Sequence, residues 1–172
     1  FSGEVFATNY RLGWVHYNYP QLPAKQLDLE EMHAILFWPG VTGIKGLIPS
    51  YALVKLWPAY EGSPGVGHNA SGFAHIFMLD YGLPIEDLLP DMPEQVLNLH
   101  SEFVFNDGVD PRGIGVDHDW TNAVFGVSTD FVLEDVENVT VTPGLYYQIT
   151  MDDSINDDQD ELWCTLGVKY SF

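Results

Sequence analysis

The sequence of 172 residues predicts an all-β fold, organised as one antiparallel meander of about eight strands. Three observations predict this fold. Apolar residues recur at every second position, turn-forming residues separate these segments, and helical periodicity is nearly absent. The best helical stretch, Ile85 to Gln95, contains Pro90 and Pro93, so we expect a turn there. Because no repeat or linker divides residues 1–172, we treat them as one domain.

The alternation is clearest in the C-terminal third of the chain. In Leu162–Phe172, apolar residues alternate with a second set that includes Thr165, Gly167 and Lys169. Two earlier segments, Val139–Met151 and Thr121–Leu133, repeat the pattern. Weaker strands are predicted at Gly13–Tyr19, Leu29–Trp38, Pro49–Trp57, Gly72–Leu83 and Gln95–Asn106. The connections predicted between strands are Pro20–Asp28, Pro39–Ile48, Pro58–Ser71, Pro84–Glu94, Asp107–Asp119, Glu134–Asn138 and Asp152–Asp160.

Composition excludes several classes of protein. The chain has 6 Lys and Arg against 25 Asp and Glu, a formal charge of -19, which repels a phosphate backbone and excludes nucleic acid as a partner. A hydrophobic content of 46% is too high for a disordered acidic chain. No apolar run reaches the roughly 20 residues of a membrane helix. The chain starts at Phe1 without a signal-peptide pattern, so we expect a mature, processed or partial chain with the lone Cys164 unpaired.

Two features favour a membrane β-barrel over a soluble β-sandwich. A soluble surface usually carries dense Lys and Glu, whereas here the polar side of the strands holds small residues such as Gly126, Gly144 and Gly167, amides and isolated charges. Aromatic residues fall near predicted strand ends, as interfacial girdles require. These aromatic residues are Tyr17, Tyr19, Trp38, Trp57, Tyr81, Trp120 and Phe172.

The C-terminus carries a third feature. The pattern Thr165-x-Gly167-x-x-Tyr170-x-Phe172 resembles the terminal signal of bacterial outer-membrane β-barrels, which the barrel-assembly machinery reads in that family. The longer pattern from Thr142 to the C-terminus also resembles porins of environmental Gram-negative bacteria. This resemblance implies an up-and-down antiparallel transmembrane barrel in the bacterial outer membrane, in contact with outer-membrane lipid and passing small solutes or cations by passive diffusion. The chain then holds about eight strands, either a complete barrel or the C-terminal part of a larger one.

Alternation predicts which polar residues face the barrel interior. As interior or pore-lining candidates we take His16, Glu31, His33, Lys55, Asp80, His100, Glu102, Asp130, Gln148 and Lys169. These residues form either structural salt bridges or a water-filled, cation-preferring passage. Bulky residues are also predicted to point inward, namely Trp14, Phe37, Tyr146 and Trp163. Since eight strands enclose little more than their own side chains, an open pore requires further strands.

The connections offer only weak candidate sites. If the last strand ends in the periplasm, Asp152–Asp160 is external, and its carboxylates Asp152, Asp153, Asp157 and Asp158 form a candidate site for loosely bound Ca²⁺. The order of a calcium-binding loop is absent, so a solvated loop is favoured there. A polar loop is likewise favoured for Asp117-His118-Asp119. We expect no other cofactor.

No enzyme motif is present, because Gly126-Val127-Ser128-Thr129-Asp130 lacks the second glycine of a nucleophile elbow. We therefore expect no catalytic activity. Two alternatives to a porin stay open: a closed barrel with a structural or surface-interaction role, and a soluble secreted acidic β-protein. The oligomeric state is open as well.

Overall fold

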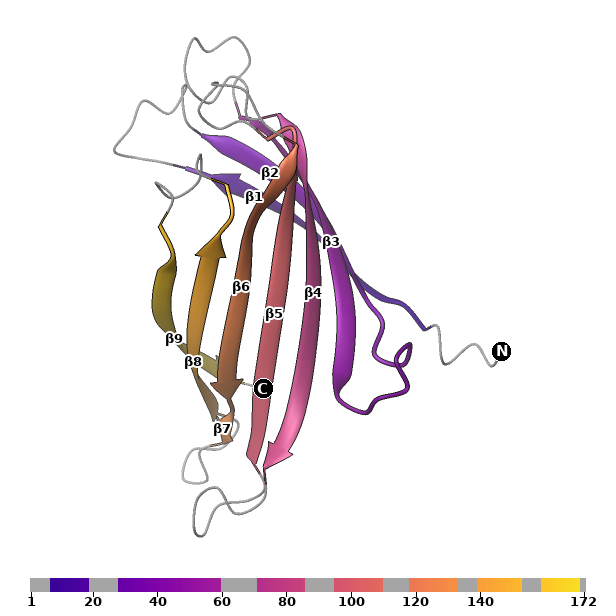
Figure 1. Cartoon of the computed structure of the whole chain (residues 1–172), viewed down its shortest axis with the longest axis vertical. Coiled ribbons are helices and arrows are strands. Elements are labelled where there is room, and N and C mark those ends of the chain that lie inside the picture. Colours follow the sequence, from indigo (N-terminus) through magenta and orange to yellow (C-terminus); the bar gives the residue numbers. More distant parts are fainter. Residues whose placement is uncertain are drawn as a thin grey trace.

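The chain forms a single antiparallel sheet that curls into a half-barrel (Figure 1). The computed structural model describes residues 7–18, 28–59, 71–85, 95–109, 118–132, 139–152 and 159–170. Its strands are β1 (Asn9–Tyr17), β2 (Leu29–Phe37), β3 (Leu47–Pro58), β4 (Gly72–Ile85), β5 (Gln95–Asp107), β6 (Asp119–Thr129), β7 (Phe131–Val132), β8 (Val139–Thr150) and β9 (Glu161–Tyr170). The predicted all-β antiparallel fold is confirmed. Within the described residues, no helix is long and apolar enough to cross a membrane.

The predicted strands match the observed ones to within two residues at each end, except at the start of β1 and between β6 and β8. Strand β1 starts at Asn9, four residues before the predicted Gly13. Thr121–Leu133 was expected to be one strand, but β6 ends at Thr129 and the two-residue β7 follows Asp130. Both β6 and β7 pair with β8. Asp130 accepts a hydrogen bond of 2.5 Å from Thr142 Oγ1 on β8. Its side chain thus contacts β8 at the point where the backbone pairing with that strand is interrupted.

The sheet does not close on itself within the described residues. Each long strand pairs with its neighbour in the chain, but β1 pairs only with β2, and β9 pairs only with β8. Figure 1 shows the strands side by side along the curved wall, from β1 and β2 at the back to β9 at one side. The half-barrel therefore has two open edges.

The meander places alternate connections at the same end of the sheet. The end that includes Tyr17, Asp107 and Thr150, at the top of Figure 1, is called the upper end. The predicted connections Pro20–Asp28, Pro58–Ser71, Asp107–Asp119 and Asp152–Asp160 all join strands at this upper end. The described connection 38–46 lies at the opposite, lower end, where Gly43 and Gly46 adopt positive φ angles of 69° and 85°.

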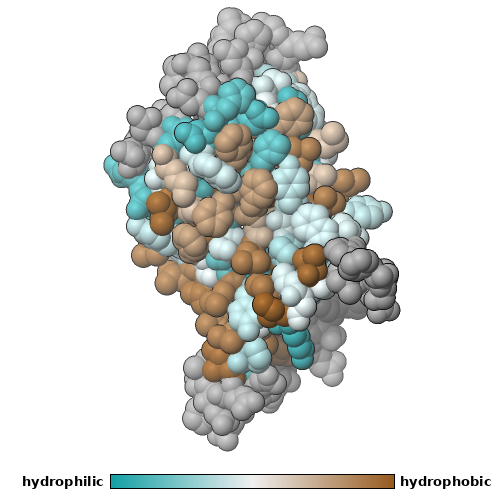
Figure 2. All heavy atoms as spheres, turned by 45° about the vertical axis from the view of Figure 1, so that its right-hand side comes forward, coloured by the Kyte–Doolittle hydropathy of each residue, from teal (hydrophilic) through white to brown (hydrophobic). Residues whose placement is uncertain are grey.

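The two faces of the sheet differ in chemistry. On the convex outer face, one register row contains Tyr51, Phe77, Phe103, Ala123 and Ile149. Most large hydrophobic side chains of this face are exposed, and Figure 2 shows apolar residues across the middle and lower part of the molecule, with hydrophilic residues toward the upper end. Among the described residues, the buried hydrophobic side chains are Ala52, Val54, Ala123 and Val124. Within the described residues, the sheet is thus a single layer without a large apolar core.

Candidate functional site

The concave inner face carries a row of polar and aromatic residues contributed by five strands. Strand register aligns Asp80 on β4, His100 on β5, Gly126 on β6, Tyr146 on β8 and Trp163 on β9. We call these five residues the inner row. Beside the row lies a cavity of about 450 Å³, which Asn98 and Ser128 also line. Because side chains alternate between faces, every second residue of each strand faces this surface.

His100 connects two carboxylates at the centre of the inner row. Its ring atom Nδ1 lies 2.7 Å from Asp80 Oδ1, and Nε2 lies 3.7 Å from Glu102 Oε2. Glu102 belongs to β5 itself, two residues beyond His100, and therefore shares its face. All three side chains are partly exposed, so the cluster is a charged wall open to water rather than a buried ion pair.

Tyr146 and Trp163 form the aromatic part of the inner row. Their rings stack with centroids 5.6 Å apart and planes inclined by 12°. The rings of Tyr146 and His100 also meet in a T-shaped arrangement, at a centroid distance of 6.4 Å. A Cβ atom on Gly126 would collide with Tyr146, and one on Gly144 would lie 2.8 Å from the same ring. The two glycines therefore make the space in which the Tyr146 ring lies against the sheet.

A second polar cluster lies on the inner face of β1 and β2. Glu31 accepts a hydrogen bond of 2.6 Å from Tyr17, and its other oxygen lies 2.7 Å from His33 Nδ1. The side chains of His33 and Glu31 are only 17% and 14% exposed. His33 lies over Gly13, where a Cβ atom would collide with its ring. Glycine again provides space for a large inward side chain.

The structure brings part of the predicted interior set together. Strand register places on the inner face Glu31, His33, Asp80, His100, Glu102, Gln148 and Lys169. Asp130 lies between β6 and β7, at the lower end of the sheet, and bonds Thr142 of that face.

His16, Lys55 and Trp14 lie on the outer face, although the alternation predicted them to point inward. Trp14, Lys55 and Phe73 share one register row on that face, and Trp14 stacks on His16 with ring centroids 6.3 Å apart. The reason is positional. Near the upper end the outer face carries polar residues as well as apolar ones, so the polarity of a residue there does not reveal its face.

A rim cluster at the upper end was not anticipated. Asp107 Oδ1 lies 2.6 Å from His118 Nδ1, and Oδ2 lies 3.5 Å from His75 Nε2. The contacts with His118 and then His75 lower the pKa of Asp107, the last residue of β5, beyond the apolar part of the outer face. His118, predicted to belong to a polar loop, lies just before β6 and contacts this carboxylate. Every described histidine in fact has a carboxylate within 4.0 Å.

Most of the candidate calcium site lies outside the described residues, since these do not include Asp153, Asp157 or Asp158. Asp152 is described, and its backbone N–H donates to Thr121 O at 3.2 Å. Asp160, which the calcium prediction did not include, accepts hydrogen bonds from Tyr147 Oη at 2.6 Å and from the Thr150 N–H at 2.9 Å. These bonds lower the pKa of Asp160, that of Tyr147 being the larger cause. Within the described residues, no group of three or more metal-ligating side chains is placed to hold a metal ion.

The residues of the C-terminal pattern lie on β9, apart from Phe172, which is outside the described residues. Thr165 and Gly167 face inward opposite Gly144 and Thr142, and Tyr170 lies exposed on the outer face. No family model matches the chain, and no curated protein or solved structure matches it either.

Proposed function

We propose that this chain forms part of the wall of an outer-membrane β-barrel and that this barrel is a porin, which passes small solutes, preferably cations, by diffusion. The observation that carries the proposal is the inversion of the two faces. Large apolar side chains are exposed on the convex face, while hydrogen-bonded carboxylates and histidines line the concave face. Lipid on the outside and water on the inside satisfy both faces.

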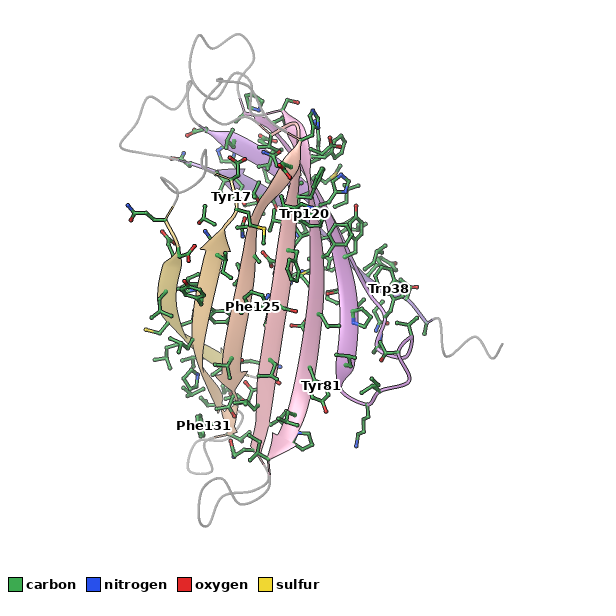
Figure 3. The ribbon with its side chains drawn as sticks, in the orientation of Figure 1. Tyr17, Trp38, Tyr81, Trp120, Phe125 and Phe131 are labelled. Atoms are coloured by element: carbon green, nitrogen blue, oxygen red, sulfur yellow. The ribbon has the colours of Figure 1, made fainter. Side chains whose placement is uncertain are left out.

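The height of the apolar face supports a membrane position. Along β5 the outer residues run from Leu97 to Phe105, interrupted only by Ser101. Eight residue steps at about 3.4 Å span about 27 Å along the strand. A transmembrane β-strand, which is tilted in the bilayer, needs about 9–11 residues, and Leu97–Phe105 has nine. Figure 3 places Trp120 near the upper end and Tyr81 and Phe131 toward the lower end, with Phe125 between them, as two aromatic girdles require.

The scarcity of buried apolar side chains argues against a soluble β-sandwich. A sandwich buries one face of each sheet against the other. Here the described chain forms one sheet, and its buried hydrophobic side chains are Ala52, Val54, Ala123 and Val124, none of them larger than valine. In water, the exposed leucine, phenylalanine and tryptophan side chains of the outer face would form an apolar surface of the kind that drives aggregation.

The open edges favour a barrel larger than this sheet. Strands β1 and β9 each keep one unpaired edge within the described residues, and such an edge presents free N–H and C=O groups. In a membrane these groups must pair, which requires closure. Further strands between β9 and β1, from a longer chain or a second copy, would complete the wall and widen the interior enough for a water-filled passage.

The charges of the inner face give the proposed passage its preference for cations over anions. Among the described residues, the carboxylates of this face include those of Glu31, Asp80, Glu102 and Glu161, and the Lys and Arg cations are Arg11 and Lys169. A ring of acidic side chains attracts cations and repels anions. Small cations should therefore pass more readily than anions of equal size.

Conductance of the full chain in planar bilayers tests this function. We expect discrete channels whose reversal potential in a KCl gradient shows cation preference, and we expect Glu102→Gln to reduce that preference. Glu30→Gln is the matched control, because it removes a carboxylate from the outer face. Well-inserted protein without conductance would overturn the porin and favour a closed structural barrel. Protein that stays monodisperse without detergent would overturn the membrane position itself.

A further inference from the structure

A groove of about 460 Å³ crosses the outer face of β1 to β4 near the upper end. Its walls include Leu12, Trp14, Met32 and Phe73. Leu12 and Trp14 are 71% and 60% exposed, unusually high values for side chains of this size. The proposed membrane position explains why the face is apolar, but it does not explain why a cation sits in this groove.

That cation is Lys55 of β3, which lines the groove between Met32 and Phe73 in the same register row. Its Nζ lies 4.5 Å from the centre of the Phe73 ring and donates a hydrogen bond of 3.2 Å to Ser71 Oγ. No carboxylate of the described residues lies within 4.0 Å of this ammonium group. The chain has 25 acidic residues, yet the groove presents an ammonium group that has no anionic partner among the described residues.

We propose that this groove binds an anionic phospholipid, with the phosphate on Lys55 and an acyl chain along the apolar wall. The inference rests on the proposed membrane position. The ammonium group and the Ser71 hydroxyl are the donors available to a phosphate oxygen, and the side chains of Leu12, Trp14 and Met32 are the apolar surface available to the acyl chain. Lys55 lies near the upper end of β3, which in the proposed membrane position is the level of the lipid headgroups and of the interfacial aromatic belt.

A second copy of the chain fits this groove less well. A two-fold contact through the groove would bring the Lys55 of each copy toward the other. It would also join two chains that each carry a net charge of -19. Additional strands paired to β1 would extend the sheet beside β1 and leave Lys55, two strands further in, facing outward.

Fluorescence quenching of Trp14 tests the proposal. The other tryptophans, at positions 38, 57, 120 and 163, are replaced by phenylalanine, and the protein is reconstituted in phosphatidylcholine bilayers that contain either brominated phosphatidylglycerol or brominated phosphatidylcholine. We expect half-maximal quenching at an about fivefold lower fraction of the anionic lipid, the factor that one lysine near a membrane surface supplies. Lys55→Gln should abolish the difference, while Lys45→Gln, at the lower end, should preserve it.

Each other outcome overturns a defined claim. Equal quenching by the two lipids, or an equal loss in the Lys45→Gln control, overturns the lipid site and leaves the membrane position standing. If neither lipid quenches Trp14 in protein that is shown to be folded, the proposed membrane position fails as well. If the variant with a single tryptophan does not fold, native mass spectrometry of the unmodified chain and of Lys55→Gln decides the question, because equal retention of phosphatidylglycerol by both overturns the site.

Discussion

The ring of Tyr146 on β8 lies in the space that a side chain at position 126 on β6 would occupy. Gly126 and Tyr146 are register partners, and a Cβ atom at Gly126 would collide with ring atoms Cδ1 and Cε1. Trp163 on β9 stacks on the same ring. The absence of a side chain on one strand thus determines how the aromatic residues of the next two strands pack.

Gly126→Ala should therefore displace the Tyr146 ring and disturb its stacking on Trp163. We expect a loss of about 1–3 kcal/mol in the free energy of unfolding, the usual cost of overpacking a tight contact. Urea unfolding followed by tryptophan fluorescence measures it. Gly167→Ala is the control, since its Cβ atom would find its nearest neighbours at an ordinary 3.6 Å. An equal loss in the two variants would contradict the specific role of the Tyr146 contact.

His100→Gln should change ion selectivity in the direction opposite to removal of a carboxylate. Without the imidazole, Asp80 loses its hydrogen-bond partner at 2.7 Å. Asp80 and Glu102 then face the interior without the basic side chain that contacts both of them. We expect stronger cation preference and a loss of about 1 kcal/mol in the free energy of unfolding. The reversal potential in a KCl gradient measures the first and urea unfolding the second. His16→Gln, beside Glu30 on the outer face, should leave the reversal potential unchanged, and a shift there would contradict the assignment of faces.

Acid should loosen the upper end of the β8–β9 hairpin. Hydrogen bonds to the Asp160 carboxylate, first from Tyr147 Oη and then from the Thr150 N–H, lower its pKa. A group with a lowered pKa stabilises the fold above its unfolded pKa of about 3.9, and this stabilisation is lost as the pH falls through the folded pKa. We expect the protection of the Thr150 amide against hydrogen exchange to fall in that range.

Tyr147→Phe should move this loss of protection to higher pH, because it removes the main cause of the lowered pKa of Asp160. Tyr170→Phe on β9 is the matched control and should leave the Thr150 profile unchanged. A profile that is the same in Tyr147→Phe and in the unmodified protein would contradict the role of this hydrogen bond.

The strands could be predicted from the sequence because alternation and turn residues are local signals. Val139–Met151 was expected, for example, and β8 is Val139–Thr150. The inner row could not be predicted, since Asp80, His100 and Tyr146 meet only through the registers of successive strand pairs. Lys55 shows a second limit. Near the end of a strand both faces carry polar residues, so its polarity predicted the wrong face.

The proposed arrangement of lipid outside and water inside can be tested at two adjacent residues of β9. Cys164, the single cysteine of the chain, is exposed on the outer face between Leu162 and Leu166, whereas Thr165 faces inward opposite Gly144. In bilayers, a charged, water-soluble thiol reagent should modify Cys164 slowly, because apolar lipid excludes it. In a Cys164→Ser background, Thr165→Cys should react at least about tenfold faster, since a charged reagent is strongly disfavoured in hydrocarbon. An uncharged, membrane-permeant maleimide should modify Cys164 readily, which controls for burial within the protein. Mass spectrometry follows both reactions, and equal rates at positions 164 and 165 with the charged reagent would contradict the inverted barrel.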